Sequence, residues 1–169
     1  MKTKLPMIGG AAVLSLLSVM QLADAANVNN EQIARGRYLV ATSGCNDCHT
    51  VGYPQADGNI PVERWLTGSP VGFQGPWGTT YPANLRISLG TLNEEQWLQK
   101  ARAPMRPPMP WVSLRDMSDN DLLAIYQFVR SLKPAGEAAP AYAGPDQAVN
   151  TPYYDFMPKN LPKVAQVAK

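Results

Sequence analysis

The chain has 169 residues, with 15 Lys and Arg against 13 Asp and Glu, which gives a formal net charge of +2 at pH 7. This near balance gives no reason to expect a nucleic-acid partner or a strongly acidic one. Fifteen of the 16 prolines lie in residues 54–82, 104–110 and 134–162, which predicts a few helices joined by long, stiff loops rather than a regular sheet.

Residues 1–25 have the pattern of a secretory signal peptide. Lys2 and Lys4 precede an apolar run from Met7 to Met20, and the tripeptide ADA that ends at Ala25 fits a signal-peptidase site. The run is shorter than the roughly 20 residues that an apolar helix needs to cross a bilayer. We therefore expect cleavage after Ala25, export to the periplasm, and no transmembrane anchor after cleavage.

A first helix is expected over residues 31–43, EQIARGRYLVATS, with Asn29 or Asn30 as its cap. Gly36 in its middle costs about 1 kcal/mol relative to Ala. The simplest reason for a glycine there is the close approach of another helix.

The stretch SGCNDCHTVGY, residues 43–53, holds both cysteines and the single histidine of the chain. A structural zinc site needs four ligands, more than Cys45, Cys48 and His49 supply. A thioredoxin-like dithiol needs a preceding strand and a βαβ pattern, which the sequence does not indicate. A disulfide is the remaining alternative for exported thiols, but it leaves His49 without a role.

C-x-x-C-H is the attachment signature of c-type haem. In this interpretation the thiols of Cys45 and Cys48 add to the two haem vinyl groups, and the imidazole of His49 reaches the iron. The haem also supplies a core for residues 50–90, which are rich in Gly and Pro and are expected to be loop. A structureless stretch of that length is unusual unless it wraps a buried ligand. The sequence therefore favours haem over a disulfide or zinc.

Two more helices are expected in the second half of the chain. One begins in TLNEEQWLQKARA, with Thr91 and Glu94 as a capping box, and must end before Pro104. The other follows Ser118 as its N-cap and ends at Pro134. Four apolar residues at helical spacing form one core-facing stripe on it: Leu122, Ile125, Tyr126 and Val129.

The second axial position of the iron falls to a methionine or stays open, because the chain has one histidine. Met109 is the first candidate, since Pro108 and Pro110 fix the backbone on both sides of it. Met105 is the alternative in the same loop, and an open or other sixth position is the third. His with Met is the ligand pair of electron-transferring cytochromes c.

The chain resembles the class I c-type cytochromes. The stretches that carry the likeness are GRYLVATSGCNDCHT (36–50), PPMPW (107–111) and MSDNDLLAIYQFVRSLKP (117–134), in the order of the family. The resemblance implies a mostly α-helical domain wrapped around one covalent haem, with long Gly/Pro-rich loops and an extended C-terminal tail. It assigns four residues to the haem: Cys45 and Cys48 as thioether links, His49 as the proximal ligand and Met109 as the distal ligand.

The signal-peptide pattern and this resemblance together divide the chain into a signal peptide (1–25), a cytochrome c domain (26–134) and a Pro-rich C-terminal extension (135–169). The family crosses its first and last helices at a small residue, which would place Gly36 near Tyr126.

Three further residues are weaker candidates for a place at the haem. The motif YPANL makes Pro82 a candidate neighbour of the proximal histidine. Trp77 or Trp65 is expected to reach a haem propionate, and the sequence does not choose between them.

The MRPPMPW loop and the helix after it are similar to the cytochrome modules of periplasmic dehydrogenases. The chain has one C-x-x-C-H motif where those modules often have several. The expected function is a periplasmic single-electron carrier, not an enzyme, that meets donor and acceptor proteins. Two alternatives stay open: a permanent cytochrome subunit of a periplasmic dehydrogenase or oxidase, and a five-coordinate haem protein that binds ligands. The aromatic extension is expected to be a strap over the domain rather than a docking arm.

Overall fold

A computed structural model describes residues 29–161. The expected signal peptide and its cleavage after Ala25 lie outside these residues, as does the last part of the extension. Within the described residues, no helix combines the length and the apolar character that a membrane span needs.

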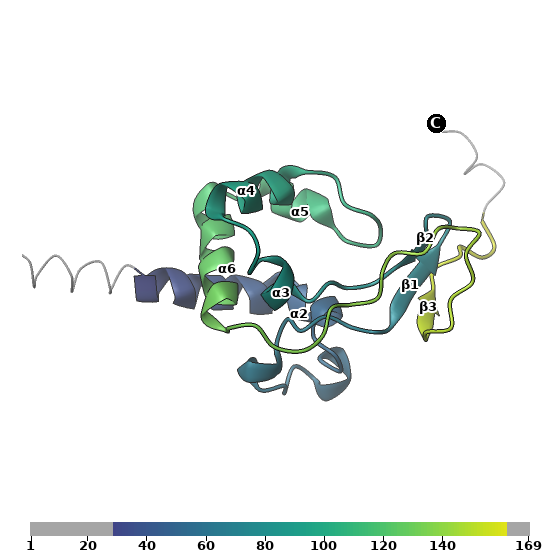
Figure 1. The fold of residues 1–169 in the computed structure, drawn as a ribbon, viewed down its shortest axis with the longest axis horizontal. Helices are drawn as coiled ribbons and strands as arrows, with labels where there is room; N and C mark the ends of the chain where they lie inside the picture. Colours follow the sequence, from purple (N-terminus) through teal and green to yellow (C-terminus); the bar gives the residue numbers. More distant parts are fainter. Residues whose placement is uncertain (1–28, 162–169) are drawn as a thin grey trace, which may run out of the picture.

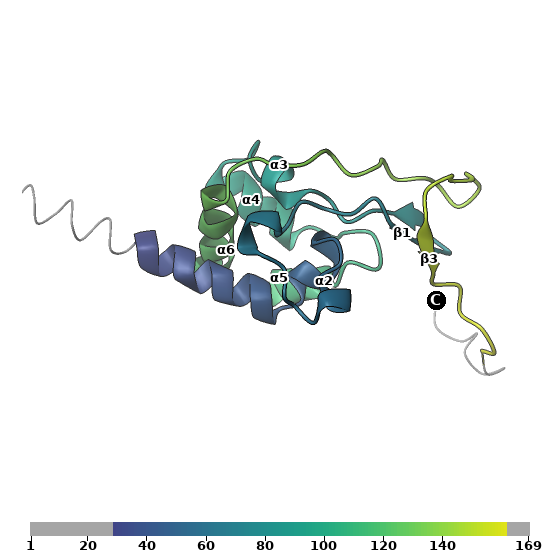
Figure 2. The same ribbon diagram turned by 90° about the horizontal axis from the view of Figure 1, so that it is seen from below.

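Short helices dominate the fold, as predicted, and a small sheet joins them. Residues 29–42 are helical, close to the expected 31–43. The remaining elements follow in the order α2 (Cys45–His49), 3-10 turns at Pro54–Ala56 and Val62–Arg64, β1 (Gly72–Gly75), β2 (Gly78–Thr80), α3 (Leu85–Ser88), α4 (Glu94–Arg102), α5 (Trp111–Asp116), α6 (Asp119–Ser131) and β3 (Tyr153–Asp155). The helices gather at one end of the molecule and the sheet lies at the other (Figure 1, Figure 2).

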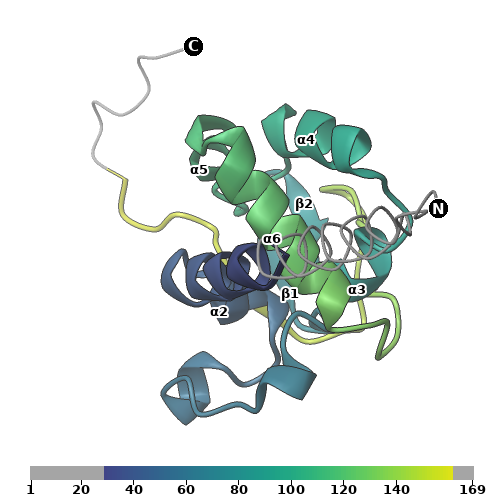
Figure 3. The same ribbon diagram turned by 90° about the vertical axis from the view of Figure 1, so that its left-hand side faces the viewer.

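The N-terminal helix crosses α6 at Gly36 (Figure 3). A Cβ atom on Gly36 would lie 1.9 Å from the carbonyl oxygen of Ala124 and 2.7 Å from Cβ of Phe128. The glycine therefore permits the close helix approach that the sequence predicts. Its nearest neighbours are these two residues rather than Tyr126, whose hydroxyl donates to the Leu92 carbonyl at 2.9 Å.

The caps of two helices decide where they begin. Ser118 caps α6 as predicted, because its side chain accepts a hydrogen bond from the Asp121 N–H, and the four stripe residues of α6 are buried. The predicted cap of α4 is wrong. Asn93 forms the capping box with Gln96, and the hydroxyl of Thr91 donates to the Ser88 carbonyl instead. The short helix α5, which follows Pro110, was not predicted.

The segment 50–90 is not wholly loop, because it contains a hairpin that the proline content did not lead us to expect. β1 and β2 pair antiparallel, with Phe73 opposite Thr80. β3 from the C-terminal extension pairs parallel to the other edge of β1. The Phe73 ring lies 5.5 Å, between centroids, from both Tyr154 and Phe156. Residues 135–156, called the C-terminal strap below, thus lie along the domain as expected.

A buried arginine fixes α3 to the end of α6. Arg86 is 7% exposed, and its guanidinium donates to the carbonyls of Leu132 and Lys133 and to that of Glu63 at 2.7 Å. A cation is favourable beside the exposed carbonyls at a helix C-terminus. Burial lowers the pKa of Arg86. The hydrogen bonds of Arg86 therefore also anchor Ala83, three residues earlier in the chain, whose carbonyl oxygen lies next to His49.

Candidate haem-binding site

Helix α2 places Cys45 and Cys48 on one helical turn, directly before His49. Both cysteines are free thiols, so the structure does not contain the alternative disulfide. Burial raises the pKa of Cys45 to about 11 and shifts that of Cys48 in the same direction. The two thiols are therefore neutral at pH 7, on the same short helix as the imidazole.

His49 is buried, with 8% of its surface exposed, and its Nδ1 lies 2.7 Å from the carbonyl oxygen of Ala83. A carbonyl oxygen can only accept, so Nδ1 carries the proton and donates it to this bond. The lone pair is then on Nε2, which is the form that ligates a metal. Burial also lowers the pKa of His49, which favours the neutral ring.

The partner of His49 is a backbone carbonyl one residue beyond the predicted neighbour Pro82. Sequence reasoning missed Ala83, because no side-chain type marks a backbone acceptor. It also missed Asn84, whose side chain accepts from the N–H groups of Arg86 and Ile87 and so caps α3. An Asn before a short apolar turn is a recognisable cap signal, and it could have located this segment.

The chain around His49 is held by the loop that returns over α2. The Gly68 N–H donates to the His49 carbonyl at 2.8 Å. The hydroxyl of Thr50 donates to the Asn46 side chain at 2.7 Å and accepts from the Leu66 N–H at 2.8 Å. These bonds hold the backbone on both sides of the histidine.

The candidate distal methionines lie in the loop between α4 and α5. The Met109 N–H donates to the Arg106 carbonyl at 3.2 Å, and the Met109 carbonyl accepts from the Trp111 N–H at 2.8 Å. Met105 and Met109 are both partly buried against the core. Helices α4 and α5 lie on the opposite side of the domain from α2 (Figure 1, Figure 3). The structure thus places the two methionines in one loop and His49 on a separate helix. It does not show which methionine is the distal ligand.

Comparison with known proteins identifies the fold family. The cytochrome c family model matches residues 33–133, more than half of the chain. The chain belongs to the cytochrome c family. The protein therefore carries covalently bound haem c with its iron, and Cys45 and Cys48 fit the attachment motif.

This cytochrome is similar to cytochrome subunits of bacterial dehydrogenases. It is 29% identical to the gluconate 2-dehydrogenase cytochrome c subunit of Pantoea cypripedii, over 76% of this chain and 29% of that protein. It is 28% identical to the alcohol dehydrogenase (quinone) cytochrome c subunit of Gluconobacter oxydans, over 73% of this chain and 27% of that protein. It is 26% identical to the fructose dehydrogenase cytochrome subunit of Gluconobacter japonicus, over 68% of this chain and 24% of that protein.

The cytochrome spans less than a third of the length of these relatives. The expected likeness to dehydrogenase cytochrome modules is confirmed. The family carries electrons, and the relatives are named as the cytochrome subunits of their enzymes. No solved structure matches the chain.

Two buried donors in the cytochrome fit a polar cofactor edge. The indole Nε1 of Trp77 and the amide Nδ2 of Asn46 are buried without a hydrogen-bond partner among the described residues. Such orphaned donors are rare in folded proteins. Trp65, by contrast, donates its Nε1 to the Ile60 carbonyl at 2.8 Å. Of the two tryptophans considered for a propionate, Trp77 is therefore the one whose donor is available.

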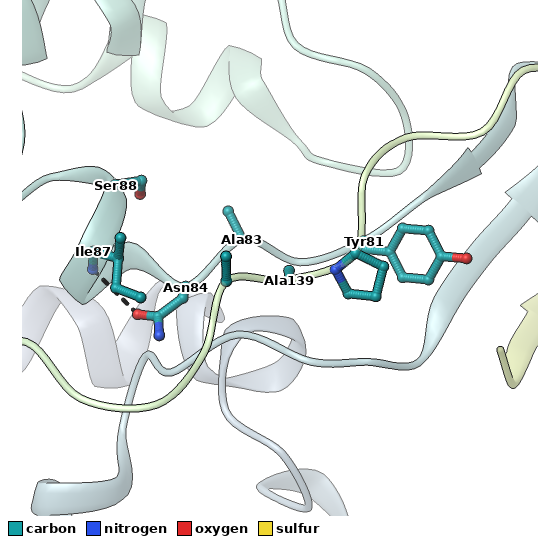
Figure 4. A pocket seen from close by; sticks show the side chains of 8 residues that line it. Tyr81, Ala83, Asn84, Ile87, Ser88 and Ala139 are labelled. Carbon is teal, nitrogen blue, oxygen red and sulfur yellow. Dashed lines mark hydrogen bonds between the residues drawn. The ribbon is translucent and has the colours of Figure 1, made fainter.

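A shallow pocket of about 210 Å³ lies between the segment 81–88 and residues 138–140 of the strap (Figure 4). Its walls are mostly small side chains, with Asn84 and Tyr81 among them. None of the cysteines, His49 or the loop methionines lines it, so it is separate from the haem-binding residues.

Proposed function

We propose that this cytochrome is a periplasmic single-electron carrier whose one haem c has His49 and Met109 as axial ligands. The observation that carries the proposal is the bond from His49 Nδ1 to the Ala83 carbonyl, 2.7 Å long. It directs the unprotonated Nε2 away from the backbone and stabilises the orientation that a proximal ligand needs. The haem supplies one-electron exchange between ferrous and ferric iron, so the protein needs no acid–base group of its own.

Met109 is favoured over Met105 by the way its backbone is held. Both its N–H and its carbonyl make backbone hydrogen bonds, and Pro108 and Pro110 restrict the residues on either side. The turn is also fixed from outside, because the Thr80 hydroxyl donates to the Pro107 carbonyl at 2.7 Å. A thioether is a weak ligand, so a restrained backbone reduces the conformational entropy lost when it binds iron.

The signal-peptide pattern at residues 1–25 supports the periplasmic location. A second candidate function is a permanent cytochrome subunit of a dehydrogenase, and the names of the relatives favour it. The two differ in one measurable way. A free carrier is purified from the periplasmic fraction as a monomer that can be reduced and oxidised reversibly. A subunit, by contrast, co-purifies with its enzyme at a fixed ratio.

The test of the carrier function is the visible spectrum of the ferrous and ferric holoprotein, with and without carbon monoxide. Two filled axial positions predict a low-spin spectrum in both states and no response to carbon monoxide. A ferrous protein that binds carbon monoxide on mixing would have an open position. The proposal would then give way to the ligand-binding alternative.

A further inference from the structure

The C-terminal strap contacts the segment that hydrogen-bonds the proposed proximal ligand His49 and the loop that carries the proposed distal ligand Met109. It leaves the end of α6, passes α3 and reaches the sheet (Figure 2). Beside the proximal segment, the Asn84 side chain donates to the strap carbonyls of Ala135 at 2.7 Å and Glu137 at 3.1 Å. Asn84 directly follows Ala83, the hydrogen-bond partner of His49.

The second contact is at Tyr142, beside the methionine loop. The guanidinium carbon of Arg106 lies 4.1 Å from the centre of the Tyr142 ring, the shortest such contact among the described residues. Arg106 is the residue whose carbonyl accepts the Met109 N–H. The strap thus reaches the turn around Met109 through one side chain.

Tyr142 is itself held firmly on the hairpin. Its hydroxyl donates to the Trp77 carbonyl at 2.7 Å. The next residue, Ala143, exchanges two backbone hydrogen bonds with Thr79, at 2.8 and 3.0 Å. The hairpin also contacts the methionine loop through the hydroxyl of Thr80. The ring of Tyr142 therefore presents a fixed surface to Arg106.

We propose that Tyr142 is a positioning residue for the distal ligand, which it holds in place by keeping Arg106 and its turn against the strap. The proposal rests on the proposed function, in which Met109 is that ligand. Movement of Met109 away from the haem requires its turn to leave the hairpin, and this movement separates Arg106 from the Tyr142 ring. Tyr142 therefore sets how often the methionine loop opens, although it does not touch the haem ligands.

The test is the rate at which imidazole replaces the sixth ligand of the ferric holoprotein. At saturating imidazole the rate is limited by the opening of the loop, and stopped-flow absorbance measures it. A cation–π contact at an exposed site accounts for about a two- to fivefold change in such an opening equilibrium. Tyr142→Ala should raise the limiting rate by about that factor.

Three further variants separate positioning from general loosening. Tyr142→Phe loses the hydroxyl bond to Trp77 but keeps the ring over Arg106 and the Ala143 backbone bonds, so its rate should lie between those of wild type and Tyr142→Ala. Arg106→Gln should be as fast as Tyr142→Ala, and the double variant no faster than either. Tyr153→Ala is the control, since Tyr153 is a 45% exposed tyrosine of the same strap, on β3; it should keep the wild-type rate.

An unchanged rate in Tyr142→Ala or Arg106→Gln, with the methionine-to-iron charge-transfer band of wild type intact, would overturn the positioning role alone. The positioning role would also be overturned if Tyr142→Phe or Tyr153→Ala were as fast as Tyr142→Ala. A wild-type protein without that band, which binds imidazole on mixing, would overturn the proposed function and this inference together.

Discussion

His49 and Ala83 are joined by a hydrogen bond from the ring Nδ1 to the backbone carbonyl oxygen, 2.7 Å long. Such a bond raises the basicity of a ligating histidine and fixes its ring. A backbone carbonyl cannot be removed by substitution, but Asn84 beside it can be changed. Asn84 is 3% exposed, and its side chain both caps α3 and binds the strap.

Asn84→Ala removes both roles and should loosen the Ala83 carbonyl. We expect a higher reduction potential, because a weaker Nδ1–H bond makes the imidazole a poorer donor, and a loss of about 1–3 kcal/mol of stability. Asn84→Ser keeps an uncharged side-chain oxygen that can cap α3 and loses the donors to the strap, so it should lie between. Potentiometric titration and urea unfolding measure the two effects. Equal potentials in all three proteins would show that Asn84 does not act on His49.

Gly36→Ala tests the helix crossing on which the domain is built. Alanine gains about 1 kcal/mol of helix propensity. Its Cβ, however, would stand 1.9 Å from a backbone oxygen of α6, which cannot move aside as a flexible side chain would. We expect a net loss of about 3 kcal/mol in urea unfolding.

Gly144→Ala is the matched control for Gly36→Ala, since its Cβ would meet Gln147 at an ordinary 3.6 Å. The control should unfold within about 0.5 kcal/mol of wild type. A stable Gly36→Ala protein would contradict the close crossing.

Asp121 gives the stability a defined dependence on pH. Its carboxylate accepts a hydrogen bond from Arg35 at 2.9 Å, and this bond lowers the pKa of Asp121 below its ordinary value of 3.8. The unfolded chain therefore binds more protons than the folded one between the two values. The stabilisation is present above the unfolded pKa and is lost as pH falls through the folded pKa.

Asp121→Asn should therefore be less stable than wild type at neutral pH, and the difference should disappear below the folded pKa of Asp121. Urea midpoints followed by circular dichroism from pH 7 to strongly acid solution measure this. The exposed Asp146→Asn, which lies in the strap, is the control and should unfold within about 0.5 kcal/mol of wild type at pH 7. A gap between wild type and Asp121→Asn that stays constant with pH would contradict the ion pair.

Local signals in the sequence predicted those parts of the fold that depend on neighbouring residues. Ser118 and the stripe on α6 could be found because a cap and a helical period are both short-range patterns. The two thiols and the imidazole of α2 have the C-x-x-C-H spacing, which is the attachment signature of c-type haem. The N-terminal end of α4 was misassigned because Thr91 and Asn93 both precede a residue that can complete a capping box, and only tertiary structure selects Asn93.

The parts that the sequence did not predict depend on contacts between distant residues. β1 pairs with β3, which lies far from it in the sequence, with Phe73 beside Tyr154, and nothing near either residue signals the other. The backbone partner of His49 lies 34 residues away. The contact between Arg106 and Tyr142 likewise joins a loop to the strap. The choice between Met105 and Met109 stays a prediction, because both are partly buried against the core.

The most direct test of the proposed ligation is the spectrum and potential of Met109→Ala, with Met105→Ala as the matched variant from the same loop. We predict that Met109→Ala loses the methionine-to-iron charge-transfer band, has a lower reduction potential and binds carbon monoxide when ferrous, since a thioether raises the potential and fills the sixth position. Met105→Ala should keep the band and the potential. A Met109→Ala protein with the wild-type spectrum and potential would contradict the assignment.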